Sequence, residues 1–173
     1  MPERYEQGEA TLVLPSDTET VVRRVFAFPP ELVFEVWTDP RHVPRWYGMR
    51  DSIMSDCRID LRVGGRWRWA QRNFHGEETA FSGVYLEIDR PNRLVFTEEY
   101  EALPGSEYLV TMTFAPHGDG GTSLTTHMRY RSREHRDGHL HSGMEAGTNA
   151  VYFQMDALMA ELPDPRSEGA TNG

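Results

Sequence analysis

The sequence predicts an α+β fold in which a curved antiparallel sheet of six to seven strands surrounds a long C-terminal helix. Three observations support this prediction. Six segments with period-two patterning follow one another between residues 54 and 130, and short turns separate them. Two short helical segments precede these strands, and an amphipathic helical segment follows them. Short turns require antiparallel neighbours, and the apolar face of such a sheet needs a cover, which the last helix supplies.

The N-terminal part supplies the first strand and the two short helices. Residues 20–28 are β-branched and aromatic, which predicts a strand, and the short apolar run 11–14 is compatible with an extra edge strand. Pro29 and Pro30 end the strand, and Pro30 suits the first turn of a helix over residues 30–39. A second short helix is expected at residues 41–47.

The middle of the chain reads as a meander. Its strands are expected at residues 54–62, 66–73, 81–89, 94–100, 108–114 and 123–130. Gly64 and Gly65 are expected to form the first hairpin turn of this meander. Because alternate residues of a strand share a face, Trp67 and Trp69 should point to the same side of the sheet.

The last segment has the apolar spacing of one long helix. One helical face carries the residues Met144, Val151, Met155, Leu158 and Leu162. Ser132 is a candidate N-cap, whereas Gly138 and Gly143 weaken the first turns, so we expect a kink there. We expect a flexible N-terminus at residues 1–10, a single domain over residues 11–162 and a disordered tail over residues 163–173.

Composition excludes several classes of function. The net charge of −9 argues against nucleic-acid binding, which normally requires a basic surface. The sequence has no apolar run long enough to cross a membrane and no signal-peptide pattern, so we expect no membrane partner and a cytoplasmic location. All 18 basic residues are arginine, which excludes catalytic lysines, and the single Cys57 excludes an intramolecular disulfide and a cysteine-rich zinc site.

No catalytic or metal-binding constellation is evident in the sequence. The spacing of His135, His139 and His141 could place metal ligands on a helix, but the region is hydrophilic and Gly138 interrupts it, which favours a solvated helix end. Glu98 and Glu99 are adjacent and would point to opposite faces of a strand, so they form a poor acid–base pair. We therefore predict no catalytic residue, no metal and no cofactor.

Three stretches resemble the START-like (SRPBCC) superfamily and, within it, the family of the activator of the heat-shock-protein-90 ATPase (its C-terminal domain). They are RRVFAFPPELVFEVWTDPRHVPRW at residues 23–46, DLRVGGRWRW at residues 60–69, and the segment 142–158, which opens with SGMEAG. The resemblance covers residues 11–162 and implies a helix-grip fold with an interior cavity between the sheet and the long helix. The small bacterial members of the family resemble binding modules.

The resemblance and the residue pattern together predict a module that binds a small hydrophobic or aromatic molecule. The candidate ligand-binding residues are Trp37, Trp67, Trp69, Met112, Phe114, Thr126, Met128, Tyr130, Met144, Thr148, Val151 and Tyr152. Two alternatives stay open: an enzyme of the polyketide cyclase or hydrolase type with acid–base residues in its cavity, or a stress-response protein that contacts a chaperone. We do not expect a chaperone partner, because the further N-terminal domain of the eukaryotic co-chaperone has no counterpart in this sequence. A homodimer also stays open.

Overall fold

Eight strands form one antiparallel sheet, in the order β1-β2-β8-β7-β6-β5-β4-β3, in the computed structural model, which describes residues 9–48 and 51–165. The strands are β1 (Thr11–Ser16), β2 (Glu19–Phe26), β3 (Ser52–Ile59), β4 (Arg66–Asn73), β5 (Glu78–Asp89), β6 (Arg93–Tyr100), β7 (Tyr108–His117) and β8 (Gly121–Arg129). The helices of the described residues are α1 (Pro30–Thr38), α2 (Val43–Trp46), α3 (Arg133–His141) and α4 (Met144–Glu161).

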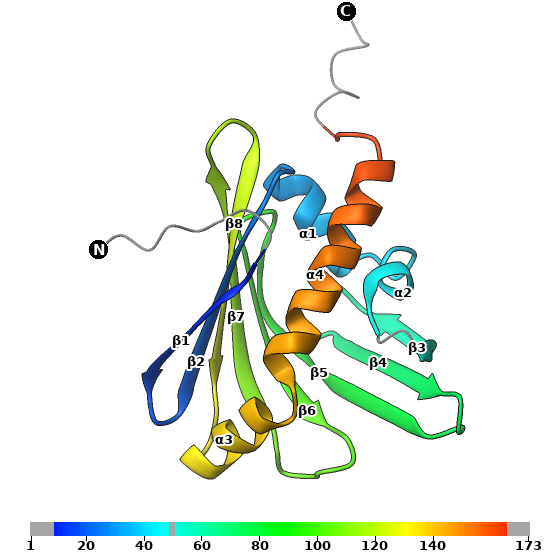
Figure 1. Cartoon of the computed structure of the whole chain (residues 1–173), viewed down its shortest axis with the longest axis vertical. Coiled ribbons are helices and arrows are strands. Elements are labelled where there is room, and N and C mark those ends of the chain that lie inside the picture. The colour runs from blue at the N-terminus through cyan, green and yellow to red at the C-terminus, as the bar shows by residue number, and fades with distance from the viewer. Residues whose placement is uncertain (1–8, 49–50, 166–173) are drawn as a thin grey trace, which may run out of the picture.

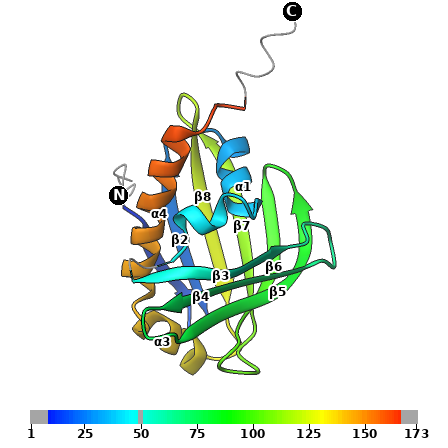
Figure 2. The ribbon, with the colours of Figure 1, turned by 90° about the vertical axis from the view of Figure 1, so that its right-hand side faces the viewer.

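The sheet curves around α4, which runs along its concave side (Figures 1 and 2). Helices α1 and α2 contact α4 near its C-terminal part, and α3 lies at the opposite end of α4 (Figure 1). The predicted α+β architecture, with two short helices before the meander and a helix across the sheet, is therefore present. Neighbouring strands of the meander are antiparallel, as the short turns between them require.

The sheet has eight strands rather than the predicted six to seven, because the N-terminal run pairs fully with β2. Backbone partners of β1 and β2 include Thr11 with Arg23 and Ser16 with Glu19, and the register shifts between Val13 and Ser16. Pro15 lies in that irregular stretch, where its missing N–H removes no ladder hydrogen bond, and β1 is an edge strand, the position in which a sheet tolerates proline.

Where a kink was predicted in one long C-terminal helix, the structure has a complete break between two helices, α3 and α4. The side chain of Ser132 accepts a hydrogen bond from the backbone N–H of His135 at 3.1 Å, so Ser132 caps α3 as predicted. Gly143 has φ of 85°, a left-handed conformation that ends α3 and redirects the chain into α4. The flexible N-terminus and the disordered tail were predicted for segments that lie mostly outside the described residues.

The predicted tight turn at Gly64 and Gly65 is in fact a longer loop. Strand β3 ends at Ile59, and residues 60–65 connect it to β4. Gly65 lies so close to the preceding chain that a Cβ atom there would be 2.0 Å from the carbonyl oxygen of Asp60. The double glycine thus permits a folded loop with close backbone contacts rather than a two-residue hairpin.

One end of the space between sheet and helices is solidly filled. Phe34 of α1 packs on Phe114 of β7, with the ring centroids 5.2 Å apart, and both side chains are almost fully buried. At this end α1 covers the sheet and leaves no room for solvent. The remaining space, under α4 and towards α3, is where the structure is hollow.

Candidate ligand-binding pocket

A pocket of about 1020 Å³ lies between the concave face of the sheet and α4. Its sheet side comes from β2 to β8, with β3 contributing only its first residue, Ser52, and its helix side comes from α4, the end of α1, the α2 segment and one residue of α3. This volume is at the upper end of the range that drug-sized ligands occupy in proteins. The pocket reaches the surface, because exposed residues such as Glu77, Ala150 and Phe153 are among those that line it.

Aromatic side chains form one wall of the pocket. The rings of Trp37 and Trp46 lie 4.9 Å apart, and the ring of Trp69 lies 5.9 Å from Trp37 and 4.9 Å from Tyr47. The indole N–H of Trp46 donates to the carbonyl oxygen of Val36 at 2.7 Å, which fixes the orientation of that ring. Such tilted and edge-on arrangements of aromatic rings stabilise one another, so this wall is a fixed apolar surface.

A few polar groups interrupt the apolar lining. The hydroxyl-bearing residues Thr126 of β8 and Thr148 of α4 both line the pocket. The indole nitrogen of Trp69 is buried and makes no hydrogen bond within the described part of the chain. A buried N–H without an acceptor destabilises the protein by about 1–3 kcal/mol, and a ligand acceptor or a water molecule at this point would remove that penalty.

The most unusual polar group is the carboxyl group of Glu98, which extends from β6 into the pocket. The hydroxyl of its cross-strand partner Tyr108 donates a hydrogen bond to it. Burial raises the pKa of Glu98 to about 7, and the hydrogen bond from Tyr108 offsets part of this shift. Burial, together with the nearby Glu98 charge, also raises the pKa of Tyr108 well above its ordinary value. Glu98 therefore changes its charge near neutral pH.

A second pair of titratable groups lies where α3 closes the pocket. The hydroxyl of Tyr130 on β8 forms a hydrogen bond with Nδ1 of His139 on α3. Burial, followed by the neighbouring His135, lowers the pKa of His139 to about 4. His139 is therefore neutral at physiological pH and acts as a hydrogen-bonding group rather than a cation.

Of the twelve predicted ligand-binding residues, eight line this pocket and four do not. The eight are Trp37, Trp69, Thr126, Met128, Met144, Thr148, Val151 and Tyr152. Their role in ligand binding stays a prediction, since what the structure gives is their position. The four others, Trp67, Met112, Phe114 and Tyr130, lie in the core beside it.

The four residues outside the pocket are packed within the core, where Tyr130 lies against Tyr108 with the ring centroids 4.9 Å apart. Phe114 lies under Phe34 of α1, and Met112 is fully buried two residues away on the same strand face. Trp67 packs on Phe96 with the ring centroids 5.6 Å apart, and its indole N–H donates to Thr97 at 3.2 Å. These side chains face inward, as the alternation predicted, but they belong to the packed core.

The predicted set did not include Trp46 and Tyr47 of the aromatic wall, nor the titratable pocket residues Glu98 and His139, which were considered and given no role. Glu98 shares a strand face with the buried Phe96, so the same alternation that placed the tryptophans also places this carboxylate inward. The prediction of a solvated helix end was wrong for His139, because the inner side of α3 faces Tyr108 and Tyr130, with ring centroids 5.5 Å from the imidazole in both cases. No motif marks Glu98, and the histidine spacing around His139 indicated a metal site rather than a residue at the pocket.

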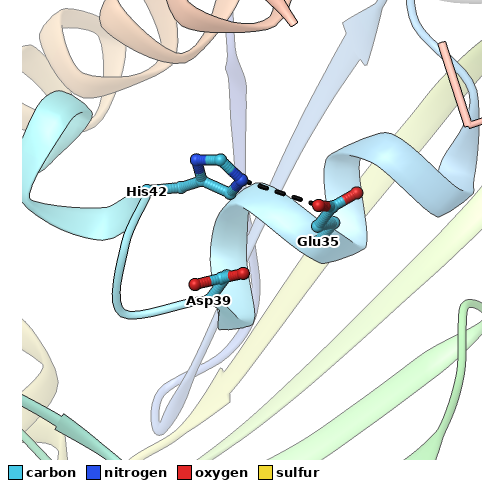
Figure 3. Close-up of side chains that lie close together, drawn as sticks. All are labelled: Glu35, Asp39 and His42. Atoms are coloured by element: carbon cyan, nitrogen blue, oxygen red, sulfur yellow. Dashed lines mark ion pairs between the residues drawn. The ribbon is translucent and has the colours of Figure 1, made fainter. Parts of the chain in front are cut away.

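Outside the pocket, Glu35, Asp39 and His42 form a cluster at the turn between α1 and α2 whose ligand atoms lie within 4.8 Å of one another (Figure 3). His42 Nε2 pairs with Glu35 Oε1 at 3.5 Å, and both carboxylate oxygens of Asp39 accept hydrogen bonds from Arg41. Each acidic group thus already has a partner within the cluster. We interpret these residues as the polar interactions that hold the turn, and we assign no metal to them.

Cys57 is a small, partly buried side chain. It is a free cysteine on β3, and burial, followed by the nearby Asp56 and Asp39, raises its pKa to about 11. The thiolate form needed for nucleophilic attack is therefore scarce at neutral pH.

A curved antiparallel sheet that surrounds a long C-terminal helix, with a pocket between them, defines the helix-grip class of proteins. The chain belongs to the family described as Activator of Hsp90 ATPase homolog 1-like protein, whose model matches residues 27–160. This confirms the predicted family and its START-like superfamily. None of the curated protein sequences matches the chain, and no helix of the described residues is long and apolar enough to cross a membrane.

Solved structures of bacterial proteins share this fold. A protein of Rhodobacter sphaeroides is 30% identical with a TM-score of 0.84, and the match covers 89% of this chain and 99% of that one. A protein of Mycobacterium smegmatis is 26% identical with a TM-score of 0.76, over 86% of this chain and 96% of that one. A protein of Nitrosomonas europaea is 24% identical with a TM-score of 0.75, over 86% and 98% of the two chains, and it supports the fold alone.

Proposed function

We propose that this protein is a binding module that takes up a small hydrophobic or aromatic molecule between the sheet and α4. The observation that carries the proposal is the pocket of about 1020 Å³, whose wall is built by Trp37, Trp46, Tyr47 and Trp69. Burial of an aromatic ligand against such a wall stabilises a complex by about 25 cal/mol per Å² of apolar surface removed from water. The few polar groups in the pocket would orient the ligand.

Native mass spectrometry of the purified protein and a thermal-shift screen with apolar and aromatic compounds test this proposal. We expect bound small molecules or compounds that raise the melting temperature, because a ligand that binds only the folded state stabilises it. If no compound in a broad apolar panel binds at millimolar concentration, the proposal is wrong.

Three variants connect binding to this pocket. Trp69→Ala should weaken binding by removing part of the aromatic wall, and Thr148→Phe should weaken it by filling the space beneath α4. Ala160→Phe introduces the same side chain at an exposed position of α4 outside the pocket and should leave binding unchanged. Equal loss of binding in both phenylalanine variants would indicate a general effect on α4 rather than occupation of the pocket.

A second candidate function is an enzyme that uses Glu98 as an acid or base. The observation that favours it is the position of this carboxyl group inside the pocket with a pKa of about 7, since acid–base catalysts work best when their pKa lies near the operating pH. Incubation of a compound identified by native mass spectrometry with wild type and with Glu98→Gln separates the two functions. Conversion by wild type alone supports an enzyme, whereas unchanged recovery from both supports binding.

A further inference from the structure

The charged side chains among the described residues that line the pocket all have the same sign. They are Asp51, Glu77 and Glu98, and no arginine is among these lining residues, although all 18 basic residues of the chain are arginine. Asp51 and Glu77 are exposed at the opening, and Glu98 lies deeper. A pocket lined by one sign of charge concentrates ligands of the opposite sign, so the described lining of this pocket favours cations.

Glu98 itself lacks a cationic partner among the described residues. Its hydrogen-bond partner is Tyr108 of β7, whose hydroxyl can satisfy only part of the accepting capacity of a carboxylate. The other titratable groups around Glu98 and Tyr108 are Tyr47 after α2, Tyr130 of β8, and His135 and His139 of α3. Burial lowers the pKa of both histidines, so none of these groups is positively charged at neutral pH. An ionised carboxylate in such surroundings is strongly destabilised unless a positive charge accompanies it.

The aromatic wall next to this carboxylate suits the same kind of ligand. Trp37, Trp46, Tyr47 and Trp69 line the pocket on the α1 and α2 side, and Phe96 lies two residues before Glu98 on the same face of β6. Aromatic faces attract organic cations by about 0.5–2 kcal/mol per well-placed ring, and weakly hydrated substituted ammonium groups are bound best in such surroundings.

We propose that the ligand of this pocket carries a substituted ammonium group, which pairs with the Glu98 carboxylate while its apolar part lies against the tryptophan wall. This inference rests on the proposed binding function and names the class of ligand. The acidic groups at the opening attract the cation, and Glu98 compensates its charge after the water has left. The bound cation in turn removes the penalty of a buried, unpaired carboxylate.

Two probes of matched shape test the inference. Benzyltrimethylammonium and neopentylbenzene differ by one atom, the quaternary nitrogen or carbon, so a difference in affinity reports the charge alone. Titration calorimetry at pH 8, where Glu98 is ionised, should show about a tenfold tighter binding of the cation, which corresponds to ~1.4 kcal/mol. At pH 5.5 this preference should fall to about twofold or less, because the probe keeps its charge and Glu98 becomes protonated.

Variants assign the preference to Glu98. Glu98→Gln should abolish the preference at pH 8, and Glu99→Gln, which removes the same charge from the opposite face of β6, should retain it. Should Glu98→Gln fail to fold, Tyr108→Phe provides the same information. It removes the hydrogen bond that stabilises the ionised carboxylate, so the pH at which the preference appears should move upward.

The outcomes separate this inference from the proposed function. If both probes bind with equal affinity, if the neutral probe binds more tightly, or if the preference is independent of pH and of Glu98, the inference is wrong and the binding function stands. If neither probe binds while other apolar compounds do, the inference is also wrong. If the broad apolar screen yields nothing as well, the proposed function fails with it.

Discussion

Glu98 and Tyr108 are direct cross-strand partners on β6 and β7, and the Tyr108 hydroxyl donates its hydrogen bond to the Glu98 carboxylate inside the pocket. The pair faces away from bulk water and towards the concave side of the sheet, where Phe96 and Val110 form the neighbouring cross-strand pair. A carboxyl group in this position has a higher pKa than one on the surface. Its protonation therefore makes the free energy of unfolding depend on pH, and this dependence can be measured.

Glu98→Gln should stabilise the protein at pH 8 and have little effect at pH 5. The folded-state pKa of about 7 lies above the ordinary value of 4.5, so the contribution of Glu98 to stability is complete below pH 4.5 and is lost as the pH rises to 7. The shift corresponds to about 3 kcal/mol, which glutamine avoids because it carries no charge. Urea unfolding at both pH values measures the difference, with Glu99→Gln as the control. An equal effect of Glu98→Gln at pH 5 and pH 8 would contradict this prediction.

His139 should produce the opposite pH dependence. Its folded-state pKa of about 4 lies below the ordinary value of 6.5, so its contribution to stability is complete above pH 6.5 and is lost as the pH falls towards 4. Between pH 4.5 and 6.5 the effects of Glu98 and His139 on stability oppose each other, so each hides part of the other's contribution in wild type. In His139→Gln the profile should instead rise as the pH falls.

The imidazole signals in an NMR titration test the histidine prediction directly. The resonance that is missing from the spectrum of His139→Gln should titrate in wild type with a midpoint about two units below that of an exposed histidine. A midpoint near 6.5 would mean that His139 is solvated and does not belong to the pocket.

The ion pair between Arg24 of β2 and Asp156 of α4 should hold the helix on the sheet. The Arg24 side chain is 2% exposed and that of Asp156 is 32% exposed, and Nη1 of Arg24 lies 2.9 Å from Oδ1 of Asp156. Asp156→Leu leaves a buried guanidinium without its partner, so we expect a loss of about 2–4 kcal/mol in the free energy of unfolding.

A double variant separates the pair from the packing around it. Arg24→Met combined with Asp156→Leu should recover most of the lost stability, because both charges are then replaced by apolar groups of similar size. Chemical denaturation of Asp156→Leu, Arg24→Met and the double variant measures the coupling free energy between the two side chains. A double variant that is as unstable as the sum of its parts would show that the ion pair itself adds little.

The inward faces of the strands could be predicted from the sequence, but the boundary between core and pocket could not. Alternation correctly placed Trp67 and Trp69 on one face, and both are buried. Only Trp69 borders the pocket, because Trp67 is covered by Phe96 and Phe114 is covered by α1. Where α1 and α2 sit on the sheet depends on tertiary packing, which the local pattern of a strand does not contain.

The surroundings of Glu98 could not be predicted from the sequence for a different reason. Its inward direction follows from the same alternation, yet a search for paired acids passed over it because its neighbour Glu99 faces the other way. The feature that distinguishes Glu98 is the absence of a cation beside it among the described residues, and this depends on side chains from β7, β8 and α3 that are distant in sequence. His139 was likewise placed in solvent because its segment is hydrophilic on average, although one side of α3 faces the pocket.

Two glycine-to-alanine changes in the C-terminal helices should have opposite effects on stability. Gly143 has φ of 85° between α3 and α4, a conformation that alanine adopts only with strain, so Gly143→Ala should lower the free energy of unfolding by about 1–2 kcal/mol. Gly138 lies inside α3, and a Cβ atom there would meet nothing within 4 Å. Gly138→Ala should therefore raise the free energy of unfolding by about 0.5–1 kcal/mol. Thermal and urea unfolding of the two variants provide the comparison. A Gly143→Ala variant as stable as wild type would indicate that α3 and α4 can join into one helix, which would move His139 relative to the pocket.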